Sequence, residues 1–157
     1  MYIRKAEEKD IPRILELLSQ VLEIHAALRP DLFVSGTTKY SYDELIELLK
    51  DNNRLVYTAV DDKDIVEGYA ICEIRQQPPR NNQVPFRSIH IDDLCVDESL
   101  REKHIGKALF EHVKSEAEKA GCYEITLNVW EGNESARSFY EKMGFGIKYT
   151  AMEYILR

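Results

Sequence analysis

The sequence predicts one mixed α/β domain in which helices flank a central, mostly antiparallel sheet. Its 157 residues are the usual length of a single domain, and 44% hydrophobic with 31% charged residues is the balance of an ordinary soluble protein. Segments with helical spacing of apolar residues alternate with segments rich in β-branched and aromatic residues, in the order β-α-α-β-β-β-α-β-α-β. No repeat, linker or low-complexity tract interrupts this order, so residues 1–157 are expected to form one domain.

The N-terminal third is predicted to contain one strand, over residues 2–5, and two helices. Pro12 suits the first turn of a helix, where a missing N–H costs nothing, and helical spacing continues until Pro30 ends the helix. Ser41 and Glu44 form a capping box, in which each side chain satisfies a free backbone N–H. This box predicts the start of a second, shorter helix.

The rest of the chain is predicted to alternate between strands and helices. Three strands are expected near residues 55–60, 65–75 and 89–96, and a surface loop with three prolines separates the last two. The elements that follow are a helix over residues 100–119 closed by Gly121, a strand over 123–130, a helix over 133–143 closed by Gly144, and a last strand or pair of strands over 145–156.

Composition narrows the function classes. A formal net charge of −7 argues against a nucleic-acid binder, which needs a basic surface, and suits either a cationic partner or plain solubility. The cysteines Cys72, Cys95 and Cys122 form no CxxC or Cys/His cluster, so no metal site is expected. Their odd number without a signal sequence favours a reducing, cytoplasmic location. No apolar run reaches the roughly 18 residues of a membrane span, so no membrane partner is expected.

One stretch, residues 94–109, has the order of a phosphate-binding turn. A strand leads through a short turn into a helix, and the free N–H groups at a helix N-terminus bind phosphate. Gly106 lets an anion approach the backbone, while Arg101, Lys103 and Lys107 add positive charge. Because many ordinary helices open with one glycine and some basic residues, this stretch alone does not decide the function.

A second stretch, residues 128–145, carries a more specific pattern. The run Asn133-x-x-Ala136-x-x-Phe139-Tyr140-Glu141-Lys142-x-Gly144-Phe145 resembles the C-terminal helix signature of the GNAT N-acetyltransferase superfamily. It lies about 30 residues after Arg101, as in that family, and the resemblance extends along the whole chain. Two positions depart from the family pattern, because His104 and Glu102 stand where glycines are usual.

The resemblance implies an acyl-CoA N-acyltransferase fold with acetyl-CoA as co-substrate. It implies that the backbone of Leu94, Cys95 and Val96 pairs with the pantetheine arm like a missing strand. The pyrophosphate would lie in the turn formed by Arg101, Glu102, Lys103, His104, Ile105, Gly106 and Lys107. Asn133 would hydrogen-bond the cofactor arm, and Tyr140 would protonate the departing thiolate. A tyrosine that merely packs in the core is the other interpretation of Tyr140.

The base and the acceptor are less sharply defined. In relatives the base often lies on the strand before the pyrophosphate turn, which here offers His90 and Asp92. Strand alternation puts these two on one face and Asp93 on the other, unless a bulge intervenes. The alternative to a catalytic base is that His90 is an exposed strand residue and that an aspartate caps a bulge. The acceptor is expected over the first helix and its following loop, near His25, Arg29 and Phe33. Asn128 could hold an acceptor or a water. The alternative for Arg29 is an internal ion pair with Asp31.

These observations predict an N-acetyltransferase that transfers an acetyl group from acetyl-CoA to a primary amine by direct attack in a ternary complex. The amine could belong to a small molecule, a peptide N-terminus or a lysine. A non-catalytic acyl-CoA-binding or regulatory module of the same fold is the alternative, and an unrelated phosphate-binding α/β protein is a third interpretation. By resemblance, a homodimer is also expected.

Overall fold

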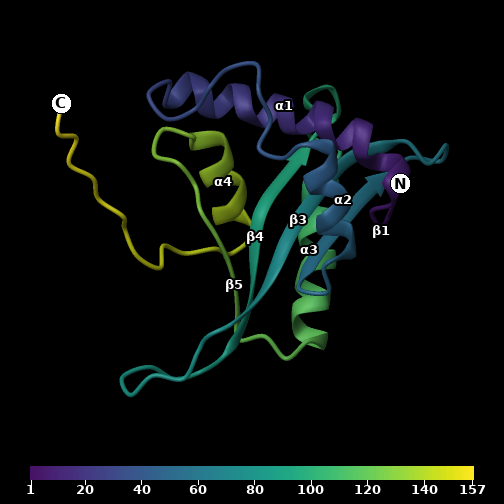
Figure 1. Ribbon diagram of the computed structural model, residues 1–157. Helices are drawn as coiled ribbons and strands as arrows, with labels where there is room; N and C mark the ends of the chain where they lie inside the picture. The colour runs from purple at the N-terminus through teal and green to yellow at the C-terminus, as the bar shows by residue number, and fades with distance from the viewer.

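The computed structural model describes all of residues 1–157 and contains one five-stranded sheet with the strand order β1-β2-β3-β4-β5 (Figure 1). The first three pairings are antiparallel, and β4 pairs with β5 in parallel. The predicted mixed, mostly antiparallel sheet is therefore confirmed. The strands are β1 (Tyr2–Lys5), β2 (Arg54–Val60), β3 (Val66–Gln76), β4 (Arg87–Val96) and β5 (Glu124–Leu127).

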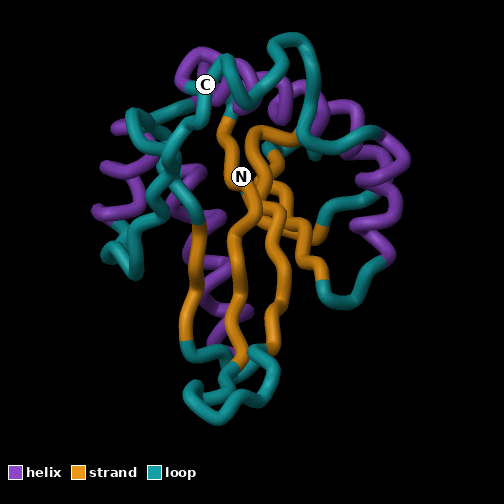
Figure 2. Tube along the Cα trace, turned by 60° about the vertical axis from the view of Figure 1, so that its left-hand side comes forward, coloured by secondary structure: helices purple, strands orange, loops and turns teal.

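Helices cover both faces of the sheet (Figures 1 and 2). One apolar cluster joins α1 (Ile11–Leu28) and α2 (Tyr42–Lys50) to β2, β3 and β4, and a second joins α3 (Ile105–Lys119) to the opposite face. The helix α4 (Glu134–Lys142) follows β5, and the 3₁₀ turns η1 (Glu8–Asp10) and η2 (Glu98–Leu100) precede α1 and α3. None of these helices combines the length and apolar character that crossing a bilayer requires.

The two helices predicted in the N-terminal third form, and their ends lie close to the positions predicted. Pro12 lies in the first turn of α1, which ends two residues before Pro30. At the start of α2, the Glu44 N–H donates to the Ser41 hydroxyl and the Ser41 N–H donates to the Glu44 carboxylate, both at 3.1 Å. The capping box therefore fixes where α2 begins.

The strands β4 and β5 are paired along only part of their length. Their register runs from Ser88 opposite Glu124 to Ile91 opposite Leu127, where β5 ends while β4 continues to Val96. The last residues of β4 therefore have a strand partner on the β3 side alone. This half-open edge positions the candidate site.

A β-bulge lies just below that open edge. On β3, Ile71 stands opposite Asp93 while the next residue, Cys72, stands opposite Ile91. Asp92 is the extra residue, and the side-chain alternation of β4 reverses there. After the reversal Asp93, rather than Asp92, continues the face on which His90 lies.

Three predicted elements differ in the structure. The helix expected over residues 100–119 begins only at Ile105, because Glu102 and His104 have φ of +72° and +62°, which a right-handed helix does not allow. The strand expected over residues 123–130 is confined to Glu124–Leu127. The last strand, expected over residues 145–156, does not form, because this segment extends away from the sheet and its backbone pairs with neither edge strand (Figure 1).

Candidate active site

The open edge of β4 contains the three residues predicted to hold a pantetheine arm. The Cys95 side chain is only 5% exposed and packs among apolar residues of α1 and the sheet, so its contribution to a ligand would come from the backbone. On the same segment, the Val96 carbonyl accepts a 3.0 Å hydrogen bond from the amide of Gln20 on α1. The Leu94 and Cys95 peptide groups that face away from β3 have no strand partner.

The N-terminus of α3 lies directly after this edge and presents free backbone donors. The first backbone hydrogen bond at this end runs from the Ala108 N–H to the His104 carbonyl, at 3.0 Å. The N–H groups of Ile105, Gly106 and Lys107 accordingly have no acceptor within the chain. Three unpaired N–H groups at a helix N-terminus are suited to bind an anion.

The two departures from the family pattern adopt glycine-like backbone. Glu102 and His104 are both in the left-handed region, at φ of +72° and +62°, and both side chains are exposed. The turn therefore keeps the path that glycines would give it, at a cost of roughly 1–2 kcal/mol for each residue with a Cβ. Arg101 and Lys103, exposed in the same turn, supply positive charge.

Gly106 is a point of close contact between α3 and α4. A Cβ on this residue would lie 3.1 Å from Cζ of Phe139, on α4. The absence of a side chain lets α4 approach the first turn of α3. That approach fixes the neighbouring residue of α4, Tyr140, relative to the open edge of β4.

Tyr140 is half-buried and keeps its proton at neutral pH, as a general acid must. Burial, followed by the nearby Asp93 carboxyl, raises the pKa of its hydroxyl above the ordinary tyrosine value, so the proton is retained at neutral pH. The hydroxyl makes no hydrogen bond within the chain, while the ring packs edge-on against Phe139 and Phe145 with centroids 5.1 and 5.5 Å away. Core packing and an available acidic proton therefore coexist in this residue.

Asp93 is a candidate that sequence reasoning did not select. Burial raises the pKa of its carboxyl to about 6, although the Tyr69 hydroxyl donates a 2.8 Å hydrogen bond that favours the ionised form. Its charge also acts on Tyr140, so the two groups share one region. The bulge at Asp92 turns Asp93 inward, and the run Ile91-Asp92-Asp93-Leu94, which places two carboxylates inside a strand, was the signal in the sequence.

The predicted pair His90 and Asp92 is not joined by a hydrogen bond. His90 is 7% exposed, its Nδ1 lies 2.9 Å from the Thr126 hydroxyl on β5, and burial lowers its pKa. Asp92 instead faces the loop before α2 and the first residue of β2. Burial opposes ionisation of Asp92, but the hydrogen bond from Tyr40 and the cations of Lys39 and Arg54 lower its pKa below the ordinary value.

Aromatic rings gather where the acceptor is expected. His25, at the end of α1, lies 5.2 Å from the ring of Phe33, and Phe33 meets Trp130 edge-on at 5.4 Å. Burial and the Lys39 cation lower the pKa of His25, which favours its neutral form. The structure thus brings Phe33 and His25 together with Trp130, which follows β5.

Arg29 forms the internal pair that was the alternative to acceptor binding. Its guanidinium donates to both carboxylate oxygens of Asp31, at 2.9 and 2.8 Å, and to Glu153 at 2.6 Å. Each of its three guanidinium nitrogens therefore already meets a carboxylate. The side chain also lies over the Trp130 ring, 5.9 Å from the centroid.

The two predicted asparagines lie on either side of the β5–α4 connection. Asn128 is exposed immediately after β5. Asn133 is the N-cap of α4, where its side-chain oxygen accepts a 3.3 Å hydrogen bond from the Ala136 N–H. Its amide NH₂ remains available as a donor.

The buried thiols are poor nucleophiles. Burial raises the pKa of both Cys72 and Cys95 to about 12, so neither is a thiolate at neutral pH.

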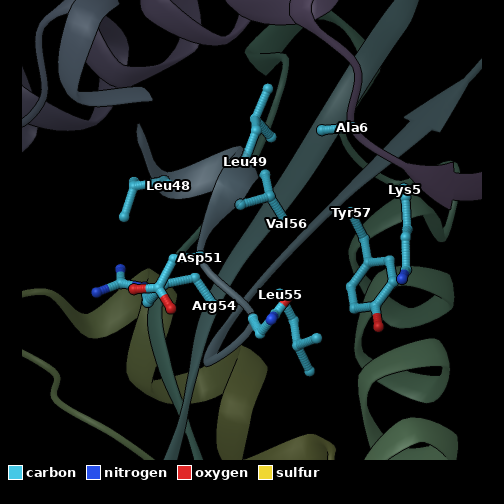
Figure 3. A pocket seen from close by; sticks show the side chains of 10 residues that line it. Lys5, Ala6, Leu48, Leu49, Asp51, Arg54, Leu55, Val56 and Tyr57 are labelled. Atoms are coloured by element: carbon cyan, nitrogen blue, oxygen red, sulfur yellow. The ribbon is translucent and has the colours of Figure 1, made fainter. Parts of the chain in front are cut away.

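A cavity of about 140 Å³ lies away from this site, between α2 and the first two strands, as Figure 3 shows. Residues such as Lys5, Leu49 and Tyr57 line it, and none of the predicted site residues does.

Comparisons with known proteins identify the family of the chain. The model of the acetyltransferase (GNAT) family matches residues 20–145. The probable N-acetyltransferase san of Drosophila melanogaster is 36% identical over 95 residues, which are 60% of this chain and 48% of that protein. The chain spans about half the length of the curated relatives that it matches.

Solved structures extend the likeness to the whole chain. A crystallised mutant of the BH1408 protein of Bacillus halodurans superposes with a TM-score of 0.96 at 28% identity, over 100% of both chains. An aminoglycoside N-acetyltransferase crystallised with CoA shares the fold, with a TM-score of 0.70 at 17% identity over 99% of each chain. The family match covers the open edge of β4, the turn before α3 and the α4 signature, and the chain therefore belongs to the acetyltransferase (GNAT) family.

Proposed function

We propose that residues 1–157 act as one catalytic domain that transfers an acetyl group from acetyl-CoA to a primary amine, by direct attack in a ternary complex. The observation that carries this proposal is the pairing of Tyr140, which keeps its proton, with the buried carboxyl of Asp93 beside the open edge of β4. A donor of one proton and an acceptor of another are what acyl transfer to an amine requires.

Acetyl-CoA would bind along the open edge and the turn that follows it. The backbone of Leu94–Val96 is available to pair with the extended pantetheine arm, as a further strand would. The free N–H groups of Ile105, Gly106 and Lys107 suit the pyrophosphate, with Arg101 and Lys103 adding charge. Asn133 keeps two amide hydrogens to donate to the arm after capping α4.

The chemistry then moves two protons. The acceptor nitrogen attacks the thioester carbonyl carbon, and its proton passes to the Asp93 carboxylate, directly or through a water. When the tetrahedral intermediate collapses, the carbon–sulfur bond breaks and Tyr140 donates its proton to the leaving sulfur. Asp93 can return a proton to Tyr140 through solvent, which restores both groups. No thiolate is needed, which fits the raised pKa values of the buried cysteines.

The acceptor is proposed to approach over α1 and its following loop. The rings of His25, Phe33 and Trp130 offer an apolar, aromatic wall there, and Asn128 offers a polar group. A chain with net charge −7 would attract cationic amines, either small molecules or the basic end of a peptide. Arg29 would contribute by holding the loop through Asp31 rather than by binding the acceptor.

Two wider expectations complete the proposal. The three cysteines are all free thiols, which supports a reducing, cytoplasmic compartment. The protein is also proposed to work as a homodimer, the expectation drawn from the family resemblance. The alternative of a non-catalytic acyl-CoA-binding module requires loss of the acid, whereas Tyr140 is present with its proton retained.

The decisive experiment is a thiol-release assay with acetyl-CoA across a panel of amines and N-terminal peptides. We expect at least one amine to release CoA in step with its own acetylation. Tyr140→Phe should lower the rate on the order of 10²-fold, since that is typical of a lost general acid. Tyr123→Phe, at a tyrosine that is 77% exposed, is the matched control and should leave the rate unchanged. If CoA binds but no amine releases thiol, the non-catalytic alternative replaces this proposal.

A further inference from the structure

Lys39, in the loop before α2, places its ammonium group against β4. Its Nζ donates to the Asp92 carboxylate at 3.0 Å and to the Asp92 backbone carbonyl at 3.3 Å. No other lysine of the chain forms a hydrogen bond or an ion pair with a residue of β4. The function proposed above gives this contact no role, although Asp92 adjoins the proposed base, Asp93.

The loop that carries Lys39 is fastened to the sheet at the next residue. The Tyr40 hydroxyl donates to the Asp92 carboxylate and accepts a 3.2 Å hydrogen bond from Arg54, the first residue of β2. On the other side of Lys39, the Thr38 hydroxyl donates to the Tyr40 carbonyl at 2.8 Å. Because both neighbours are held, the Lys39 side chain extends from a fixed point rather than from a free loop.

The charge of Lys39 acts on groups of the candidate active site. Burial lowers the pKa of His25, and the Lys39 cation lowers it further. Burial raises the pKa of Asp93 to about 6, while the Tyr69 hydrogen bond and then the Lys39 cation act in the opposite direction. Coulomb interactions weaken with distance, so the ammonium lies close to both groups. It therefore lies beside the centre at which the amine of an acceptor would react.

The Lys39 ammonium is also free to move. Its side chain is 46% exposed, so the contact with Asp92 can be exchanged for one with water or with a nearby group. The four-carbon stem is flexible, and rotation about its bonds can carry Nζ from Asp92 toward the adjacent Asp93 while the loop stays in place. An amine tethered in this way meets a bound thioester at a high effective concentration.

We propose that Lys39 is an acetylation site of the chain itself, modified by acetyl-CoA bound to the same molecule; this inference rests on the proposed function. The ammonium first gives one proton to Asp93. Its nitrogen then attacks the thioester carbonyl carbon, so that a carbon–nitrogen bond forms and the carbon–sulfur bond breaks. Tyr140 protonates the leaving sulfur and regains a proton from the nitrogen through solvent. The products are acetyl-lysine, CoA and the proton released from Asp93.

The test is the position and rate of modification in the full-length protein, incubated with acetyl-CoA and no added amine and followed by intact mass and peptide mapping. We expect Lys39 to be acetylated on the order of 10²-fold faster than Lys119. The Lys119 side chain is 70% exposed and reports the reaction of an ordinary surface lysine. Lys39→Arg keeps a cation beside Asp92 and should take up acetyl groups only at the Lys119 rate. Thermal unfolding of this variant checks that its fold is retained.

A mixing experiment separates reaction within one chain from reaction between chains. Unlabelled wild type is incubated with isotope-labelled Tyr140→Phe and acetyl-CoA. Lys39 of the wild-type chain should be acetylated with a first-order rate constant that does not change with protein concentration, and Lys39 of the labelled chain should stay unmodified.

Two outcomes would overturn the proposal. They are acetylation of Lys39 no faster than that of Lys119, and equal modification of the two chains in the mixture. If external amines are acetylated while Lys39 is not, this inference fails and the proposed function stands. If acetyl-CoA binds but neither Lys39 nor any external amine is acetylated, the proposed function fails as well.

Discussion

Replacing Asp93 by Asn tests the assignment of the base with little change of shape. Asn keeps an oxygen that can accept the hydrogen bond from the Tyr69 hydroxyl, which is 2.8 Å long in the structure, but it cannot take up a proton. We expect kcat/KM to fall on the order of 10²-fold, since general bases typically contribute between 10² and 10⁴. The same substitution should also make the protein more stable at neutral pH.

The stability change follows from the pKa of about 6, which burial of the Asp93 carboxyl produces. That value lies roughly 2 above the ordinary pKa of an aspartate, and each pKa unit corresponds to about 1.4 kcal/mol. The folded chain therefore holds this proton more tightly than the unfolded chain does. As pH rises from about 4 to about 6, the unfolded chain releases its proton first, so stability falls by up to about 3 kcal/mol and stays lower above that window.

The assay combines a pH–rate profile with thermal unfolding. Wild type should show an acidic limb in kcat/KM near pH 6, where Asp93 gains its proton, and Asp93→Asn should lack that limb. Asp92→Asn is the control from the neighbouring residue. Burial opposes ionisation of Asp92, but the hydrogen bond from Tyr40 and the Lys39 and Arg54 cations lower the pKa of its carboxyl. Removing this charge should therefore decrease stability at neutral pH. The acidic limb in kcat/KM should remain in place.

Three results would contradict the reasoning about Asp93. Full turnover of Asp93→Asn, with the acidic limb retained, would show that another group accepts the proton. Loss of the limb in His90→Gln, with Asp93→Asn unaffected, would assign the base to His90 instead. A variant that loses both activity and stability would contradict the expected opposite changes.

The turn before α3 and its packing support two further predictions. His104→Gly removes the Cβ from a residue at φ +62° and should raise the free energy of unfolding by about 0.5–1 kcal/mol, once the greater freedom of glycine in the unfolded chain is subtracted. The melting temperature should therefore rise, and CoA binding measured by calorimetry should not weaken. An unchanged or lower melting temperature would mean that this conformation is not strained. Gly106→Ala should destabilise the protein by up to about 2 kcal/mol, because overpacking of its Cβ, 3.1 Å from Phe139, exceeds the roughly 1 kcal/mol that alanine gains over glycine in a helix. It should also lower kcat by displacing Tyr140. A variant with wild-type unfolding and turnover would show that α4 shifts without cost.

Much of the fold could be predicted from local signals in the sequence. Pro12 and the Ser41–Glu44 capping box determine helix starts through hydrogen bonds within a few residues, and such interactions can be recognised without knowing the rest of the fold. The α4 signature likewise fixed Tyr140 and Asn133 together, because both lie on one short helix. These parts of the site depend on neighbours in the sequence.

The remaining parts depend on contacts between distant segments. The bulge at Asp92 arises from how β4 pairs with β3, so the inward turn of Asp93 was visible only as one of two alternatives. The basic turn before α3 has ordinary residues in left-handed backbone at Glu102 and His104, which composition alone would extend as helix. Residues 145–156 include strand-forming residues, but whether they form a strand depends on pairing with a distant segment, which local sequence does not specify.

Hydrogen exchange with and without acetyl-CoA tests the central claim most directly, because it reports where along the backbone the co-substrate binds. The account predicts new protection at the amides of Leu94–Val96 and of Ile105–Lys107, the open edge of β4 and the free N-terminus of α3. Protection confined to the cavity between α2 and the first two strands, at residues such as Leu49 and Val56, with no change at those two segments, would contradict it.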